Sequence, residues 1–462
     1  MARVCVMGGG PAGSIFAIRM AELGHQVELI ESARFPRPHL GESLSPGVLP
    51  LLQSLGAEGA LAGACPVRQV EVAWDGPPLI RADERAEGRL VDRGTFDRRL
   101  IDQARSLGVR IRQPARIIER RHDERGWHLA IETEAGREKL AADFLADARG
   151  RGAVGAWRRE TTGPATLALH AYWKGTGSPP HPVIRAGDEA WYWAVPLPDG
   201  TCNMQVFVDA RQFGASPKAT LAARYLHLLD HSGFGRGLRQ SEVMARDATP
   251  YVARRAATSS SIALGEAALA LDPLSSSGVQ KAIQTSLAGA IVANTLIRRP
   301  AAAAAAMDFY KASLEDASTR HRNWAAGYYA EAARMRPASF WQDRAAAAPG
   351  ETPRRPVVST DAAGAVAQPV ELSRDLVIED LPCIEGEFVT LARALRHPGL
   401  AGPVAFLGDQ PLAPLVNDLH SGATLVEIAQ GWSRRMPFKS ALSIAIWLRN
   451  SGILVDRAEA RP

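Results

Sequence analysis

Three glycines near the start of the chain, Gly8, Gly10 and Gly13, have the GxGxxG spacing of a turn that binds a phosphate group. The first glycine allows a tight bend, the second leaves room for a pyrophosphate, and the third lets a helix pack closely on a strand. Glu31 follows Gly13 by 18 residues, where a carboxylate can accept hydrogen bonds from the ribose hydroxyls. The predicted phosphate-binding residues are Gly8, Gly10, Pro11, Ala12 and Gly13. The pattern predicts a bound dinucleotide.

The elements that must position this turn are visible on both sides of it. Residues 4–7 form a short apolar strand, residues 14–23 are helical in pattern, and residues 26–30 form a second strand that ends at Glu31. A helix that starts at the turn directs free N–H groups and the positive end of its dipole at the phosphates. Within this complete unit the glycine pattern is specific, whereas glycines alone also fit a turn without a ligand.

Composition indicates a globular enzyme of two or three domains. The chain has 462 residues, of which 46% are hydrophobic and 22% are charged. A net charge of +5 is spread along the chain, whereas a nucleic-acid-binding protein more often concentrates it in a stripe. The four cysteines, Cys5, Cys65, Cys202 and Cys383, have no CxxC or metal-ligand spacing and read as reduced thiols. We therefore predict no metal site and no nucleic-acid partner.

Targeting signals are not visible in the sequence. No charged segment followed by an apolar stretch precedes the first strand. No uninterrupted apolar run reaches the ~18 residues of a membrane span. The prediction is a cytoplasmic protein that does not enter a membrane.

The predicted fold is α/β, a Rossmann-type cofactor-binding domain with an interleaved antiparallel-sheet substrate domain and a C-terminal helical module. Residues 1–165 and 245–340 are assigned to the cofactor domain with interleaved strands, and residues 166–244 mainly to the substrate sheet. Residues 345–370 read as a linker, being rich in Ala, Pro, Thr and Gly. Residues 371–462 form the last module, with short helices predicted at 391–395, 425–429 and 441–448 and a winged-helix shape as one option.

A second motif resembles the downstream FAD fingerprint of the para-hydroxybenzoate hydroxylase superfamily, written GDAA…DP…G. It consists of residues 264–268, with Glu266 where the pattern has Asp, followed by Asp272, Pro273 and Gly278. In that superfamily the acidic residue contacts the ribityl or phosphate region of FAD, and the helix after the Pro and Gly faces the flavin ring. The resemblance implies FAD as the cofactor, with Asp272, Ser277 and Gly278 among its binding residues.

Three further segments resemble the flavin-dependent halogenase branch of this superfamily. Residues 37–44 resemble its R…GES loop, which places Glu42 and Ser43 near the flavin. Residues 91–97 resemble an R..FD element whose arginine, Arg93 here, contacts the cofactor. Residues 191–196 resemble the WxWxIP box, and alternation on a strand puts Trp191 and Trp193 on one face. The two indoles either wall the flavin from the substrate or pack in the core.

The resemblance assigns the catalytic region to Glu42, Arg68, Trp191 and Trp193. Glu42 is either an acid or base at the pocket or a capping or salt-bridged carboxylate. Halogenases send hypohalous acid to a lysine a few tens of residues after the GES loop, yet no lysine precedes Lys139. Arg68 occupies about that place, and an arginine stays protonated, so it cannot replace the amine. Oxygen transfer from a flavin C4a-hydroperoxide needs no lysine, so hydroxylation is favoured over halogenation.

The overall organisation is similar to that of flavoproteins that mature tryptophylquinone cofactors, in particular the monooxygenases of quinohemoprotein amine dehydrogenase biogenesis. That resemblance implies hydroxylation of a peptidyl tryptophan in an amine dehydrogenase small subunit, with O2 as oxidant and NAD(P)H or a flavin reductase as electron source. The C-terminal module then binds the client protein, serves stability or dimerisation, or, least favoured, binds DNA. A halogenase and a geranylgeranyl-reductase-like flavoprotein remain alternative functions.

Overall fold

The computed structural model of the chain describes residues 1–37, 39, 42–82, 87–153, 157–175, 177–213, 217–234, 237–347, 368–400 and 402–457. Its backbone separates into two units. The first comprises residues 1–297 and 314–350, and the second comprises residues 298–313 and 351–462. The two units are considered one at a time.

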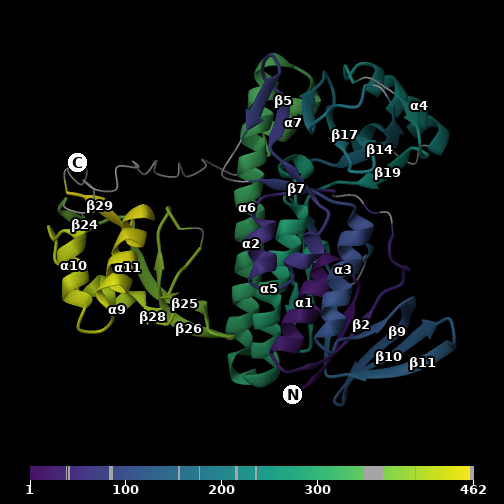
Figure 1. The fold of residues 1–462 in the computed structure, drawn as a ribbon. Helices are drawn as coiled ribbons and strands as arrows, with labels where there is room; N and C mark the ends of the chain where they lie inside the picture. Colours follow the sequence, from purple (N-terminus) through teal and green to yellow (C-terminus); the bar gives the residue numbers. More distant parts are fainter. Residues whose placement is uncertain are drawn as a thin grey trace. The chain divides into compact units, whose positions relative to one another are not determined.

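A mostly parallel sheet carries the phosphate turn in the first unit. Its six strands lie in the order β21 (Ala257–Thr258), β22 (Ser261–Ala263), β12 (Phe144–Asp147), β1 (Arg3–Met7), β2 (Gln26–Ile30) and β8 (Arg110–Arg112). All neighbouring pairs are parallel except β21 and β22. Helices α1 (Pro11–Glu22) and α3 (Arg93–Ser106) contact each other beside this sheet (Figure 1). The predicted strand–turn–helix–strand unit is therefore present.

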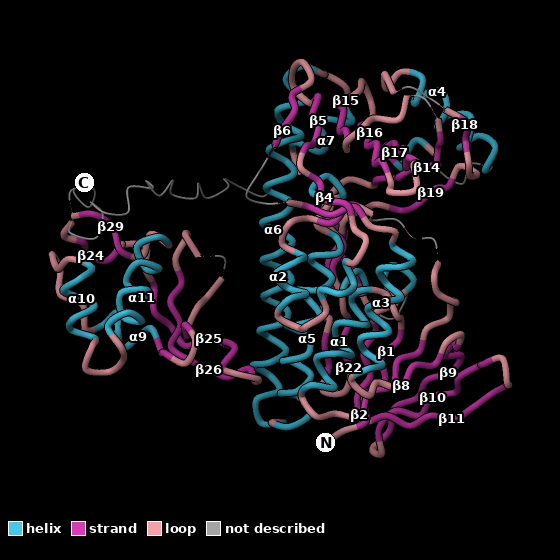
Figure 2. Tube along the Cα trace, viewed as in Figure 1, coloured by secondary structure: helices cyan, strands magenta, loops and turns pink. Residues whose placement is uncertain are grey.

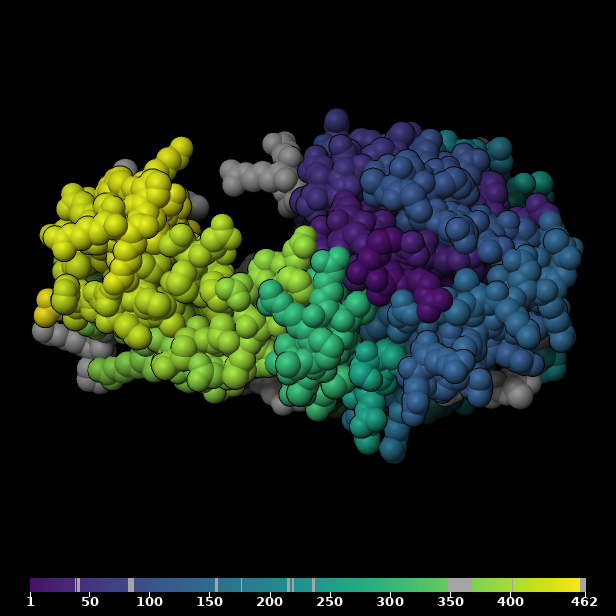
Figure 3. Space-filling model, turned by 90° about the horizontal axis from the view of Figure 1, so that it is seen from below, coloured from purple at the N-terminus to yellow at the C-terminus, as the bar shows by residue number. Residues whose placement is uncertain are grey.

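A small antiparallel sheet covers one part of the parallel sheet. It consists of β9 (Ala115–Asp123), β10 (Gly126–Thr133) and β11 (Gly136–Ala142). Cys5 and Met7 of β1 pack in one buried cluster with Leu129 and Ile131 of β10. In the space-filling view of Figure 3 the purple N-terminal residues lie beside the blue residues of these strands.

A large sheet forms the other end of the first unit (Figure 2). Its strands are β18 (Leu238–Arg239), β14 (Thr166–Lys174), β17 (Thr201–Asp209), β16 (Trp191–Pro196), β15 (Val183–Ala186), β5 (Gln69–Ala73) and β6 (Leu79–Ala82), with β19 (Met244–Asp247) also paired to β14. One face packs into a cluster with Trp191, Trp193 and Phe207, and the opposite face packs into another with Tyr192 and Val206. The central strands β14, β16 and β17 thus bury both faces, with alternate residues in each cluster.

Small sheets and further helices complete the first unit, except that the first residues of α6 belong to the second unit. The small strands are β3 (Ser43–Leu44), β7 (Gly88–Leu90) and β4 (Cys65–Val67) in one sheet, and β13 (Arg159–Thr161), β20 (Tyr251–Ala253) and β23 (Leu269–Ala270) in another. The helices are α2 (Val48–Gln53), α4 (Lys218–Asp230), α5 (Gly278–Arg298), α6 (Ala303–Met335) and α7 (Ser339–Ala345). Among the helices in the described ranges, none is long and apolar enough to cross a lipid bilayer.

The second unit has a core of its own, built from residues between Val370 and Leu454. Its elements are β24 (Val370–Leu372), β25 (Val377–Glu385), β26 (Phe388–Arg396), β27 (Phe406–Leu407), β28 (Gln410–Pro411), α9 (Leu412–Asn417), α10 (Leu425–Trp432), α11 (Phe438–Asn450) and β29 (Leu454–Asp456). The helices predicted at 425–429 and 441–448 lie within α10 and α11. The predicted linker falls largely on residues 348–367, which lie outside the described residues.

The helix predicted at residues 391–395 is wrong. These residues belong to β26, which pairs with β25 in a hairpin whose register places Glu385 opposite Phe388. Gly386, at φ +56°, supplies the first turn residue between the two strands. Leucines at 391 and 395 suggested a helical face, but Leu391 is 62% exposed while Leu395 is buried. The turn and the cross-strand pairing outweigh the local helical pattern.

Candidate active site

The phosphate turn has the backbone geometry that its sequence predicted. Gly8 adopts φ +102°, and a side chain at Gly13 would come within 1.9 Å of the Gly8 carbonyl oxygen. A Cβ on Gly10 would meet only the Arg37 guanidinium, at 3.6 Å. Gly10 caps α1 without a side-chain hydrogen bond, and the first turn of the helix has no acidic residue. The N-terminus of α1 is therefore suited to an anion.

Two charged side chains flank this turn. Glu31 is buried at the end of β2, and its carboxylate accepts hydrogen bonds of 2.7 Å from the backbone N–H groups of Gly9 and Ala33. The Arg37 guanidinium lies near Gly10, and its buried Nε has no hydrogen-bond partner among the described residues. A carboxylate and a guanidinium thus lie beside the glycines, and these are groups of the kind that bind a ribose and a phosphate.

Arg93 begins α3 and is buried against its own helix. Its Nε and Nη2 each donate a 3.0 Å hydrogen bond to Asp97, one turn later. Burial alone would lower the pKa of Arg93, but the charge of Asp97 and the hydrogen bonds outweigh it, and the net pKa is raised. Arg37 also lies 3.9 Å from the Asp97 carboxylate. Arg93 is thus a fixed positive charge next to the R…GES loop.

The second fingerprint meets the first in space. A Cβ on Gly265, which lies in the short helical turn Gly265–Ala267, would be 2.7 Å from Cβ of Ala12 in α1. Glu266 is exposed at its carboxylate and forms a 3.3 Å ion pair with Arg151. Segments 250 residues apart therefore converge at the N-terminus of α1.

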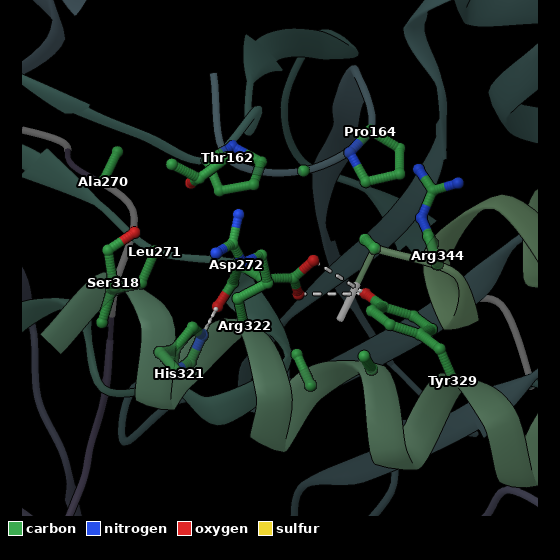
Figure 4. Close-up of a pocket in the computed structure, with 15 residues that line it drawn as sticks. Thr162, Pro164, Ala270, Leu271, Asp272, Ser318, His321, Arg322, Tyr329 and Arg344 are labelled. Carbon is green, nitrogen blue, oxygen red and sulfur yellow. Dashed lines mark hydrogen bonds between the residues drawn. The ribbon is translucent and has the colours of Figure 1, made fainter. Parts of the chain in front are cut away.

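Asp272 is held firmly by groups of the protein itself. Its side chain caps the turn Pro273–Ser275 by accepting from the Leu274 N–H at 3.0 Å. It also accepts from the Tyr329 hydroxyl at 3.0 and 3.1 Å, as Figure 4 shows, while His321 contacts its backbone oxygen. Together with Arg344 these residues line a pocket between α6 and the strands around residues 250 and 270. The contacts fix the turn that leads into α5.

Ser43 and the start of α5 are neighbours. The Ser276 hydroxyl donates a 2.9 Å hydrogen bond to the Ser43 carbonyl oxygen, and Ser276 adopts φ +52°, an uncommon value for a side-chain-bearing residue. Ser277 shares a 2.6 Å hydrogen bond with Ser275, and Gly278 is the first residue of α5. Ser43 and the segment that leads into α5 thus lie side by side.

Glu42 is buried and connects this surface to the large sheet. Its Oε1 accepts hydrogen bonds from the Tyr172 hydroxyl at 2.6 Å and from Nδ2 of Asn203 at 3.0 Å. Burial, followed by the nearby Glu42 charge, raises the pKa of Tyr172, so the phenol remains a donor at neutral pH. Glu42 is therefore held by side chains of β14 and β17.

Trp191 and Trp193 lie on one face of β16, as the sequence predicted. Trp191 stacks on Phe207 with ring centroids 3.7 Å apart and an interplanar angle of 7°. Trp193 is 6.4 Å from Trp191, and its buried Nε1 has no hydrogen-bond partner among the described residues. Arg68 lies apart from this group: its side chain is 76% exposed and pairs with Glu87 at 3.3 Å.

Sequence reasoning missed the polar residues of the sheet, namely His170, Tyr172, Asn203 and Gln205. They occupy alternate positions on β14 and β17, on the same face as the two tryptophans. The sequence does contain a pattern that indicates them. Polar and apolar residues alternate in His170-Ala-Tyr172 and Asn203-Met-Gln205, within otherwise apolar strands. Only the fold shows that this polar face meets Glu42.

Comparison with known proteins identifies the family. The tryptophan halogenase family model matches residues 3–68 and 89–372. The chain belongs to the tryptophan halogenase family. It is 28% identical over 373 residues to a tryptophan 2-halogenase from Chondromyces crocatus, covering 73% of this chain and 70% of that protein. It is 26% identical to a flavin-dependent halogenase from Armillaria mellea, covering 69% of this chain and 70% of that one.

Two solved structures of the same fold align with nearly the whole of this tryptophan halogenase family member. The peptidyl tryptophan dihydroxylase QhpG, essential for tryptophylquinone cofactor biogenesis, matches with a TM-score of 0.76 and 28% identity, over 98% of this chain and 99% of that one. The flavin-dependent halogenase CmlS matches with a TM-score of 0.77 and 20% identity, over 99% and 96%, a likeness of fold. The chain is accordingly a halogenase-like flavoprotein oxidoreductase, and FAD is its cofactor.

Proposed function

We propose that this enzyme hydroxylates an aromatic ring, and that the ring is a tryptophan side chain within a polypeptide. The observation that carries the proposal is the likeness to a peptidyl tryptophan dihydroxylase over 98% of the chain at 28% identity, the second unit included. The lysine distribution supports it, because the sequence has no lysine before Lys139. Arg68, which occupies the corresponding segment, is exposed and permanently charged.

The described residues fit FAD in an extended form. The glycine turn and the N-terminus of α1, with Arg37 beside them, would hold the pyrophosphate, and Glu31 would hold the ribose. Ser43 and residues 276–278 would lie along the flavin ring, with Arg93 and Asp272 supporting that site. When bound and reduced, FAD supplies the chemistry that activates O2. The chain supplies the binding, orientation and dryness of the site.

The large sheet presents two kinds of group to an aromatic substrate. Trp191, Trp193 and Phe207 offer flat apolar surfaces on which a ring can stack. Glu42, held by Tyr172 and Asn203, places a carboxylate at the end of this face nearest Ser43. In this role Glu42 binds a proton released or required as the ring is oxidised. The reaction partners are O2, a flavin reductase and, as client, an amine dehydrogenase subunit.

The experiment that tests the proposal supplies FAD-loaded enzyme with a flavin reductase, O2, a tryptophan-containing client subunit and either chloride or bromide. Mass spectrometry of the client then distinguishes an added oxygen from an added halogen. One or two oxygens on a single tryptophan support hydroxylation. A halogenated tryptophan supports the second candidate, a halogenase, which the family match and the curated relatives favour. A client unchanged in both salts contradicts both functions.

A further inference from the structure

Four buried polar atoms without partners lie on one face of the large sheet. They are Nδ1 and Nε2 of His170, Nε1 of Trp193 and Oδ1 of Asn203, none of which has a hydrogen-bond partner among the described residues. His170 is 4% exposed, Asn203 is fully buried and Trp193 is 9% exposed. A buried polar group without a hydrogen-bond partner destabilises the folded protein. Four such atoms in one place indicate a ligand that provides the missing partners.

The strand register fixes where these groups stand. On the face that contacts Glu42, Tyr172 of β14 pairs with Asn203 of β17. In the next row His170 pairs with Gln205, and Gln205 pairs with Trp193 of β16. Rows on one face are about 6.6 Å apart, because each residue advances a strand by about 3.3 Å. His170 therefore lies one row from Tyr172 and Asn203, the two residues that hold Glu42.

The row after that one is apolar. Ala168 pairs with Phe207, and Phe207 pairs with Trp191, on which it stacks. The polar row of His170, Gln205 and Trp193 is thus bounded by the Glu42 cluster on one side and by aromatic rings on the other. A ligand that fits it has a flat apolar body and a polar edge.

Neighbouring groups leave the imidazole available as an acceptor. The Tyr172 hydroxyl, whose ring is 6.1 Å from that of His170, already donates to Glu42. Burial, with a smaller contribution from Arg246 on β19, lowers the pKa of His170 to about 4. The ring is consequently neutral at pH 7, and one of its nitrogens accepts a hydrogen bond. Indole has one N–H donor on a flat aromatic body, which complements that acceptor.

Resting on the proposed function, we propose that His170 is a specificity-determining residue that accepts a hydrogen bond from the indole N–H of the substrate tryptophan. This contact would select indole over aromatic rings without an N–H donor. It would also set the rotation of the ring relative to Glu42, since the polar row and the Glu42 cluster lie at fixed separation on the same strands.

The test measures binding without turnover, so that it is independent of the reaction assigned to the enzyme. Full-length enzyme with oxidised FAD is titrated anaerobically with indole, 1-methylindole and benzothiophene, and the flavin absorbance change gives Kd. We expect the wild type to bind indole about tenfold more tightly than either analogue, the equivalent of one hydrogen bond. In His170→Phe the ratio of the analogue Kd to the indole Kd should fall to about one. In Tyr192→Phe, whose side chain lies on the opposite face of the sheet, this ratio should stay at about ten.

Each alternative outcome contradicts the proposal. If the wild type does not prefer indole, or gives no spectral response to any probe, the imidazole is not the acceptor. If His170→Phe retains the preference, another group recognises the N–H. If His170→Phe alters FAD affinity or the flavin spectrum before any probe is added, the residue belongs to the cofactor site. Hydroxylation of the client, measured separately by mass, can succeed or fail under every one of these outcomes.

Discussion

The hydroxyl of Tyr172 donates a 2.6 Å hydrogen bond to Oε1 of Glu42, and this bond connects the loop before β3 to the large sheet. The same oxygen accepts from Asn203, so that one carboxylate oxygen holds two strands. The two partners are 130 and 161 residues away from Glu42 in the sequence. Glu42 is therefore a structural connection as well as a candidate catalytic group.

Replacement of Glu42 should show how strongly the folded protein depends on these two hydrogen bonds. Glu42→Ala leaves the Tyr172 hydroxyl and the Asn203 amide without an acceptor in a buried site, and should lower the free energy of unfolding by about 2–4 kcal/mol. Glu42→Gln keeps an acceptor oxygen and should cost about 1 kcal/mol. Chemical denaturation of the FAD-loaded proteins measures both values. Equal losses in the two variants would show that the hydrogen bonds do not hold the loop.

A methyl group on Gly10 should weaken FAD binding without destabilising the folded protein. In the protein alone it meets only the Arg37 guanidinium, at 3.6 Å, an ordinary contact. It occupies the space through which a pyrophosphate approaches the backbone, so Gly10→Ala should weaken FAD binding by at least about tenfold. Fluorescence titration of apoprotein with FAD gives the affinity. Gly59→Ala, with open space around it, is the control and should bind FAD normally. Unchanged affinity in Gly10→Ala would argue against this position of the pyrophosphate.

The stability of the protein should depend on His170 below neutral pH. The pKa of about 4 for His170 in the folded protein lies under the ordinary value of 6.5, so the unfolded chain binds the proton first. The contribution of neutral His170 to the free energy of unfolding is fully present above pH 6.5 and is lost as the pH falls towards 4. Between pH 7.5 and pH 5 the wild type should lose about 2 kcal/mol more than His170→Phe. Denaturation curves at the two pH values measure the difference, and parallel losses would show that the folded imidazole titrates normally.

Removal of residues 351–462 should leave the flavin site intact. The first unit contains every residue assigned to FAD, and the core of the second unit lies wholly between Val370 and Leu454. We expect the truncated chain to retain FAD and its visible spectrum but to hydroxylate the client at least about tenfold more slowly. Binding of indole to the truncated holoenzyme serves as the control and should be unchanged. Full activity on the client would refute a client-binding role for the second unit.

Local patterns were enough to predict the phosphate turn, because its glycines, the two flanking strands and Glu31 all lie within residues 3–31. The wall of the site could not be predicted in the same way. His170 and Asn203 could be recognised as site residues only from the strand register and from the contact of Asn203 with Glu42 in a distant loop. At residues 391–395 a local pattern even pointed to the wrong element, since pairing with β25 decides the conformation there. Long-range pairing carries information that spacing in the sequence does not.

The last helix of the first unit, α7, has a mechanical consequence. Nη2 of Arg344 donates to Thr166 at the start of β14, and Nε1 of Trp341 donates to the carbonyl oxygen of Asp188 before β16. Arg336, just before α7, donates to the carbonyl oxygens of Trp74 and Ala186. These bonds join α7 and the end of α6 to several strands of the large sheet, so the sheet and α7 move as one body. Entry of the proposed polypeptide client would therefore depend on the loops at the rim and not on separation of the sheet from α7.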